Sequence, residues 1–92
     1  MKLPISRFSV HGKSMNPILK EGQDVLVSSW LYKPKVGDIV VIKKNGKEMI
    51  KRIQTIRDRD IFVIGDNVSE STDSRHFGPI EKAQIVGKII FR

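Results

Sequence analysis

Ser14 and Lys51 are the residues of this chain whose types could together carry out nucleophilic chemistry. Ser14 lies in the stretch HGKSMNP, between Gly12, whose backbone can adopt unusual angles, and Pro17, which constrains the chain. A serine hydroxyl needs a base to accept its proton, and no histidine of the chain is a suitable partner. A neutral lysine can be that base, so the composition permits a serine–lysine dyad. Taken alone, a serine between a glycine and a proline is weak evidence for catalysis.

A polar run at residues 65–78, GDNVSESTDSRHFG, is a second candidate for chemistry. It begins with three residues that favour turns, Gly65, Asp66 and Asn67, and continues with hydroxyls, carboxylates and Arg75. A small domain does not need such a run for packing. These groups could form a hydrogen-bonded network that holds another group in place, although a solvated surface loop is the alternative.

A β-hairpin is expected to position Lys51. In the stretch VVIKKNGKEMIKR, Asn45-Gly46 supplies the two residues of positive φ that a type I′ turn requires. Counting outward from this turn predicts the pairs Lys44 with Lys47, Lys43 with Glu48, Ile42 with Met49, Val41 with Ile50, and Val40 with Lys51. Strand alternation then places Lys51 on a face with the apolar side chains of Val40, Ile42, Met49 and Ile53.

A lysine among apolar side chains loses hydration of its charged form, which lowers its pKa and makes it a possible base. Two alternatives stay open. The apolar residues between 49 and 56 also fit helical spacing, and a helix would dissolve the predicted register. Lys51 could also extend its amine to the edge of the sheet and remain hydrated.

The elements around these residues are predicted to be strands. Short β-like runs separated by turn residues occupy 8–11, 24–28, 39–43, 48–56, 61–64 and 85–91, and helix is limited to one turn at 17–20. Five or six strands in 92 residues predict a mainly β protein, antiparallel or mixed, with little helix. Nothing divides the chain, so we expect one compact domain over residues 1–92.

Composition narrows the function. The net charge of +7 suits nucleic acid or anionic lipid, but the basic residues are spread along the chain without a nucleic-acid-binding motif, so we expect no nucleic acid partner. The absence of cysteine and the isolation of His11 and His76 predict no metal and no other cofactor. Trp30, Leu31 and Tyr32, close to two lysines, are expected to pack in the core or to make a peripheral membrane contact.

Four stretches, in chain order, resemble the conserved boxes of the type I signal peptidases and their small relatives: GKSMNPIL, VGDIVVIK, MIKRI and GDNVSESTDSRHFGPI. The similarity extends from about residue 10 to residue 91, nearly the whole chain. The resemblance implies a serine endopeptidase with a β-rich catalytic domain of the signal-peptidase or self-cleaving-repressor type.

The same resemblance implies roles for single residues. Ser14 matches the nucleophile and Lys51 the general base. Ser71 matches the serine that orients the lysine amine, and Asp73 and Arg75 match the charged pair that supports the site. Backbone N–H groups at Gly12 and Ser14 are expected to serve the oxyanion, and Met15 and Pro17 the substrate groove. The implied substrate is a protein or peptide with small residues, such as alanine, one and three positions before the cut.

Three departures from the family pattern bear on function. Gly12 stands where many relatives carry a hydroxyl that serves the oxyanion hole. The family's N-terminal membrane anchor and the large insertion of some bacterial members are missing. We therefore expect either a short, soluble and cytoplasmic protease, like those linked to maturation of nickel-type superoxide dismutase, or a membrane-associated enzyme with an external active site whose anchor has been removed.

Two further functions remain as alternatives. A self-cleaving repressor-type protease domain uses similar dyad chemistry, but residues 65–75 and the lack of a DNA-binding domain argue against it. A basic β module without catalytic activity, binding nucleic acid or anionic membrane, is the alternative from another class.

Overall fold

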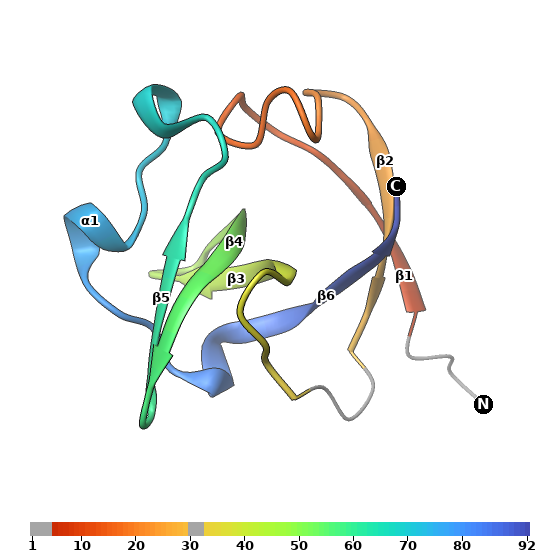
Figure 1. Ribbon diagram of the computed structural model, residues 1–92. Helices are drawn as coiled ribbons and strands as arrows, with labels where there is room; N and C mark the ends of the chain where they lie inside the picture. Colours follow the sequence, from red (N-terminus) through yellow and green to blue (C-terminus); the bar gives the residue numbers. More distant parts are fainter. Residues whose placement is uncertain (1–4, 30–32) are drawn as a thin grey trace.

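The protein folds as one six-stranded antiparallel sheet, which a computed structural model describes for residues 5–29 and 33–92. The strand order is β1-β2-β6-β3-β4-β5 (Figure 1). The strands are β1 (Ile5–Ser9), β2 (Asp24–Ser28), β3 (Ile39–Lys44), β4 (Lys47–Arg57), β5 (Asp60–Ile64) and β6 (Ile85–Phe91). The predicted mainly β fold is therefore confirmed.

Helix is restricted to short segments in the described part of the chain: the 3-10 turns η1 (Val68–Glu70) and η2 (Lys82–Gln84), and α1 (Ser74–Phe77). Within residues 5–29 and 33–92, none of these helices has the length and apolar character that crossing a bilayer requires. The membrane contact suggested for Trp30, Leu31 and Tyr32 concerns residues outside the described ranges.

The predicted strands agree with the structure at 24–28 and 85–91, and the remaining four are extended or shifted by a few residues. The first prediction, residues 8–11, is wrong in its bounds, because β1 runs from Ile5 to Ser9. Val10 still bonds to residues 22 and 23 across the loop, but the chain turns at Gly12, whose φ is +79°. The single helical turn predicted at 17–20 is a turn without helix.

The β3–β4 hairpin has the predicted register. Asn45 and Gly46 have φ values of 53° and 77°, as a type I′ turn requires. All five predicted pairs form, and Val40 lies opposite Lys51. The alternative helix over residues 49–56 is therefore wrong: this segment belongs to β4.

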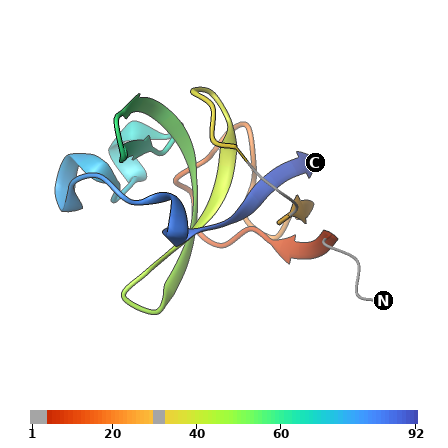
Figure 2. The same cartoon turned by 90° about the horizontal axis from the view of Figure 1, so that it is seen from below.

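The core divides into two clusters on opposite faces of β3. Val41 packs on one face with Val10, Met15, Leu19, Val25, Val27, Ile39, Ile50 and Ile89, and we call this the first cluster. Val40 and Ile42 pack on the other with Ile53, Ile61, Val63 and Ile80, and we call this the second cluster. β3 therefore lies in the middle of the molecule (Figure 2), and the first four of its residues are buried.

Two loops that are distant in sequence lie side by side at one end of the sheet (Figure 1). One follows β1 and contains Ser14. The other follows β5 and contains the polar run at 65–78. Backbone bonding joins them, since Asn67 N–H donates to the Ser14 carbonyl at 2.7 Å. The first half of β4, residues 47–51, lies beside these two loops, so Lys51 is close to both.

Candidate active site

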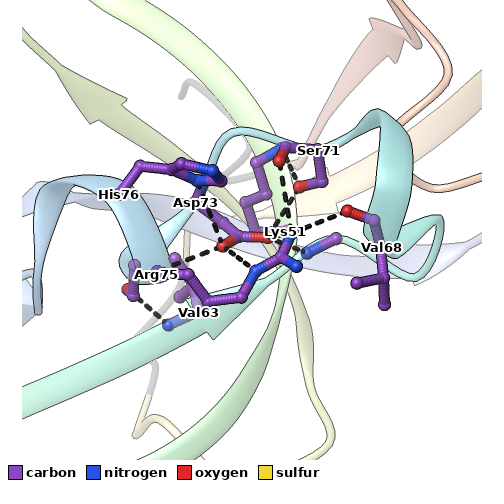
Figure 3. Close-up of polar contacts among 9 residues, drawn as sticks. Lys51, Val63, Val68, Ser71, Asp73, Arg75 and His76 are labelled. Atoms are coloured by element: carbon purple, nitrogen blue, oxygen red, sulfur yellow. Dashed lines mark hydrogen bonds and ion pairs between the residues drawn. The ribbon is translucent and has the colours of Figure 1, made fainter.

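Lys51 is buried, with 3% of its surface exposed, and Met49 and Ile53 flank it on the same face of β4. Its Nζ donates a hydrogen bond to Ser71 Oγ at 3.0 Å (Figure 3). Among the described residues, Ser71 is the one hydrogen-bond partner of the Lys51 amine. The amine therefore does not reach bulk water along the sheet edge, which was the alternative placement.

A second bond extends this contact to Asp73. Ser71 Oγ donates to Asp73 Oδ2 at 2.8 Å, so a single hydroxyl connects the amine to a carboxylate with no exposed surface. Gly65 N–H donates to the same oxygen at 2.9 Å. Since Ser71 Oγ has one proton and gives it to Asp73, it must accept the bond from Lys51.

Arg75 covers Asp73 from the solvent side. Its Nε lies 2.8 Å from Oδ1 and its Nη2 lies 3.0 Å from Oδ2, which is a bidentate ion pair (Figure 3). The same Nη2 also donates to the Val68 carbonyl at 2.7 Å. The guanidinium thus ties the carboxylate to the preceding loop.

The local sequence explains how Asp73 is held. Asp73 is the N-cap residue of α1, and its Oδ1 accepts a hydrogen bond from Arg75 N–H. Its own N–H donates to Nδ1 of His76 at 3.2 Å, which completes a capping box. A helix of one turn is thereby sufficient to orient the carboxylate toward Ser71.

These contacts shift two pKa values. Burial lowers the pKa of Lys51, Asp73 opposes this effect by attraction, and Arg75 adds to it by repulsion. Burial alone would raise the pKa of Asp73, but the hydrogen bonds from Arg75, Gly65 and Ser71 outweigh it and hold that pKa well below its usual range. Near neutral pH, Asp73 is therefore an anion paired with Arg75, and Lys51 loses its proton more readily than an ordinary lysine.

Only glycine fits at position 65. A Cβ there would lie 2.2 Å from Ser71 Oγ and 2.7 Å from the Ser14 carbonyl oxygen. Both distances are far below van der Waals contact. Gly65 thus lets the strand end approach the hydroxyl that binds Lys51 and the loop that carries Ser14.

Ser14 lies half-buried in a turn that two segments hold. The Lys13 carbonyl accepts bonds from Asn16 N–H at 3.1 Å and from Asn67 Nδ2 at 3.0 Å. Ser14 and Lys51 line one open cavity of about 340 Å³, together with the rest of residues 11–14, residues 47–50, Glu70 and Thr72. Among the described residues, no hydrogen bond joins the Ser14 hydroxyl to the Lys51 amine.

The beginning of β4 presents a free backbone edge to this cavity. Residues 47–52 pair with β3 on one side, whereas β5 pairs only with residues 52–57. Residues 47–51 therefore have no strand neighbour on their second side within the described chain. Such an edge can accept an extended peptide.

The expected groove residues lie elsewhere. Met15 is 1% exposed and packs in the first cluster, where its Sδ accepts a hydrogen bond from Asp66 N–H at 3.4 Å. Pro17 is exposed, and neither residue lines the cavity. The residue after Ser14 thus turns into the core, and the predicted contact of Met15 and Pro17 with substrate stays a prediction. Gly12 does line the cavity.

Asp66 and Asn67 make contacts that their place in the sequence does not predict. Asp66 forms a bidentate ion pair with Arg52, both bonds at 2.8 Å, beside Lys51 in the chain. Asn67 donates hydrogen bonds to the carbonyls of Lys13 and Ser14. The turn chemistry of residues 65–67 indicated a special loop, but the partners are 14 and about 50 residues away and no local pattern names them. Within the described residues, no three side chains of His, Asp or Glu gather to hold a metal ion.

Comparison with known proteins identifies a family that the chain resembles over most of its length. The sequence profile of one family, described as signal peptidase, peptidase S26, matches residues 2–56 and 53–92. Signal peptidase I V of Bacillus subtilis (strain 168) is 29% identical over 137 residues, covering 89% of this chain and 82% of that protein. Mitochondrial ATP-independent inner membrane protease subunit 1b of Arabidopsis thaliana is 32% identical, covering 89% of this chain and 66% of that protein.

The alignments also show a difference in length. Signal peptidase IB of Staphylococcus aureus (strain Mu50 / ATCC 700699) is 25% identical over 150 residues, although this chain has 92. The relative therefore carries additional residues inside the aligned region. The two matched segments of the family profile meet at residues 53–56, in the second half of β4, which indicates where this chain is shorter.

Proposed function

Since this chain belongs to the signal peptidase family, peptidase S26, we propose that it is a serine endopeptidase with Ser14 as nucleophile and Lys51 as general base. One observation carries the proposal. Lys51 is buried and its amine is fixed by Ser71 at 3.0 Å, in a cavity that it shares with Ser14. Burial of a lysine amine costs free energy, so this placement supports a functional role for Lys51.

The proposed reaction follows from these positions. The neutral Lys51 amine takes the proton of Ser14 Oγ while the oxygen attacks the carbonyl carbon of the scissile peptide. The resulting ammonium then protonates the leaving nitrogen as the C–N bond breaks, leaving an ester on Ser14. Water attacks the ester, its proton passes to Lys51, and the ammonium returns a proton to Ser14 Oγ as the acid product leaves. Distances between catalytic groups commonly shorten only when substrate is bound.

Ser71, Asp73 and Arg75 are proposed to keep Lys51 ready for this cycle. Ser71 accepts a hydrogen bond from Nζ and so fixes the direction of the amine. An isolated Asp73 carboxylate would favour the ammonium and make Lys51 a weaker acid in the second half of the cycle. Arg75 balances that charge, so Asp73 orients Ser71 without holding the proton on Lys51.

The oxyanion of each tetrahedral intermediate requires hydrogen-bond donors. We assign the backbone N–H of Ser14 to this role, since Gly12 has no hydroxyl to offer from the position two residues earlier. The backbone of Gly12 lines the same cavity and supports this placement.

The substrate is proposed to bind as an extended strand along residues 47–51 of β4. The unpaired backbone of this edge supplies main-chain hydrogen bonds, and it leads directly to Lys51. The cavity of about 340 Å³ has room for small side chains next to the cut. By resemblance to the family, we propose an N-terminal signal or pro-peptide with small residues at the first and third positions before the cleavage site.

Cleavage of a peptide with an Ala-X-Ala site tests this function. We expect Ser14→Ala and Lys51→Ala to lower kcat/KM at least about 1,000-fold, because a nucleophile and its base act as a unit. Ser6→Ala and Lys20→Ala are matched controls at exposed positions and should cleave at the wild-type rate. Cleavage that survives both active-site substitutions would exclude the dyad. Binding to nucleic acid that weakens with salt, with no cleavage by any form, would support the basic-module alternative.

A further inference from the structure

Asn67 contacts both peptide groups that flank Ser14. Its side-chain Nδ2 donates to the Lys13 carbonyl at 3.0 Å, and its backbone N–H donates to the Ser14 carbonyl at 2.7 Å. One residue, 53 positions later in the chain, therefore holds the peptide groups before and after the Ser14 Cα. Asn67 itself is anchored, since its carbonyl accepts from Glu70 N–H at 3.0 Å.

These two bonds determine where the Ser14 groups point. The Lys13–Ser14 bond is trans, because the cis bond of the described chain is Asn16–Pro17. In a trans peptide the N–H points opposite to the C=O, so the Ser14 N–H points away from Asn67. With both flanking planes held, φ and ψ of Ser14 are fixed, and with them the direction of its Cα–Cβ bond.

The Ser14 N–H is available as a donor. Within the described residues it has no acceptor, whereas the carbonyls on both sides of it are bonded. Gly12 adds no hydroxyl, so the proposed oxyanion site depends strongly on this backbone group. A peptide group that rotates would remove the donor without changing any side chain at the dyad.

We propose that Asn67 is a positioning residue that clamps the two peptide groups around Ser14 and thereby aims its hydroxyl and its N–H at the same substrate carbonyl. The inference rests on the proposed function, since it assigns the geometry of the same site. The Asn67 side chain reaches the nucleophile loop and forms no hydrogen bond with Lys51, Ser71 or Asp73 within the described chain. Its effect is therefore separable from that of the base.

Two substitutions, Asn67→Ala and Asn67→Asp, test the clamp, the second more severely than the first. Alanine removes the donor to the Lys13 carbonyl, and aspartate replaces it with an oxygen that repels that carbonyl. We expect kcat to fall about 10- to 100-fold for alanine and about 100- to 1,000-fold for aspartate, the range measured for loss of one oxyanion donor, with KM changed less than about threefold. Gln54→Glu is the matched control, because it makes the same change of amide to acid at an exposed position of β4.

Two inhibitors separate positioning from a merely structural role. A substrate-like peptide aldehyde needs the Ser14 hydroxyl and the oxyanion donor, whereas the same peptide as an amide needs only the groove. We expect Asn67→Ala to weaken aldehyde binding about as much as it lowers kcat, to leave amide binding unchanged, and to leave the pH midpoint of kcat/KM at the wild-type value.

The outcomes distinguish this inference from the proposed function. If the wild type does not cleave, the function itself fails. If the wild type cleaves and Asn67→Ala keeps kcat within twofold, the clamp fails while the function stands. If binding of the peptide aldehyde and of the peptide amide weakens equally, and both Asn67 variants show a large decrease in Tm, Asn67 only supports the fold. This result would also overturn the clamp.

Discussion

At the residue scale, the protein buries a lysine amine that has one neutral contact, and three nearby charges act on it: Asp73 in one direction, Arg75 and Lys47 in the other. Burial lowers the pKa of Lys51, Asp73 raises it, and Arg75 lowers it again. Ser71 is the only one of these groups that touches the amine in the described structure. The protonation state of Lys51 should therefore depend on the charge of Arg75, although the guanidinium forms no hydrogen bond with the Lys51 amine.

Arg75→Gln should move the pH profile of kcat/KM to higher pH. The active form requires neutral Lys51, so activity rises with pH through the pKa of Lys51 in the free enzyme. In the wild type we expect that midpoint below the ordinary value for lysine, because burial lowers the pKa. Without Arg75, Asp73 attracts the ammonium unopposed, the pKa of Lys51 rises, and less of the enzyme is active at pH 7.

Arg57→Gln removes the same charge at an exposed position of β4 and should leave the midpoint unchanged. A midpoint that stays constant or moves to lower pH in Arg75→Gln would contradict the charge balance proposed for Asp73. Steady-state cleavage from pH 6 to 11 at constant ionic strength is sufficient to measure the shift.

At the element scale, the β3–β4 hairpin decides on which face Lys51 lies. A slip of one residue would turn Lys51 to the opposite face of the sheet, toward the first cluster and away from Ser71. The Asn45-Gly46 turn prevents this slip, because both residues adopt the positive φ of a type I′ turn. The turn thus connects a local sequence signal to the geometry of the site.

Gly46→Ala should lower stability without changing the chemistry of the site. A Cβ at Gly46 meets nothing within 4 Å, so its cost is the positive φ of 77° alone, about 1 kcal/mol. In a domain of this size that corresponds to a decrease in Tm of about 4–8 °C, measured by thermal unfolding. The pH midpoint of kcat/KM should stay at the wild-type value.

Gly87→Ala is the comparison. A Cβ there would lie 2.6 Å from the Ser28 carbonyl oxygen, a backbone atom that cannot easily move. It should lower Tm more than Gly46→Ala. A greater loss in Gly46→Ala, or a shifted pH midpoint, would show that the turn does more than hold the register.

At the scale of the whole molecule, stability depends on β3 being covered on both faces. A 92-residue chain has little apolar surface to spare, and here it is divided between two clusters. Ile42 has no exposed surface and belongs to the second cluster, the one that adjoins Lys51 on its face of β4. A cavity in this cluster therefore affects a large share of the total stability.

Ile42→Ala should cost about 2–5 kcal/mol, the range for deleting a fully buried isoleucine side chain. Since small domains are stable by only about 5–15 kcal/mol, chemical denaturation should show a transition at much lower denaturant. Ile90→Ala, at a position 49% exposed, should change stability by less than about 0.5 kcal/mol. Similar losses for the two variants would mean that the second cluster is not a packed core.

Much of the fold follows from local patterns. The strands at 24–28 and 85–91, the hairpin turn and its register were predicted from apolar alternation and from Asn45-Gly46, and the structure confirms them. The predicted bounds of the first strand are wrong, because β1 ends at Ser9. Val10 still bonds to residues 22 and 23, although it lies beyond the end of the strand. The placement of Met15 was also missed, since a loop residue next to Ser14 shows no periodicity that assigns it to a core.

The sequence by itself determined the face of β4 on which Lys51 lies, because a two-residue turn and the period of two in a strand are local properties. It also determined family membership, since four motifs in order are a property of the chain. Only the tertiary structure decided that Asn67 holds the Ser14 turn and that Lys51 is buried, and it supplies the contact between Ser71 and the Lys51 amine that the family resemblance implied. These contacts join residues 20 to about 50 positions apart, so they depend on how the sheet curves and how its loops meet, which no local pattern encodes.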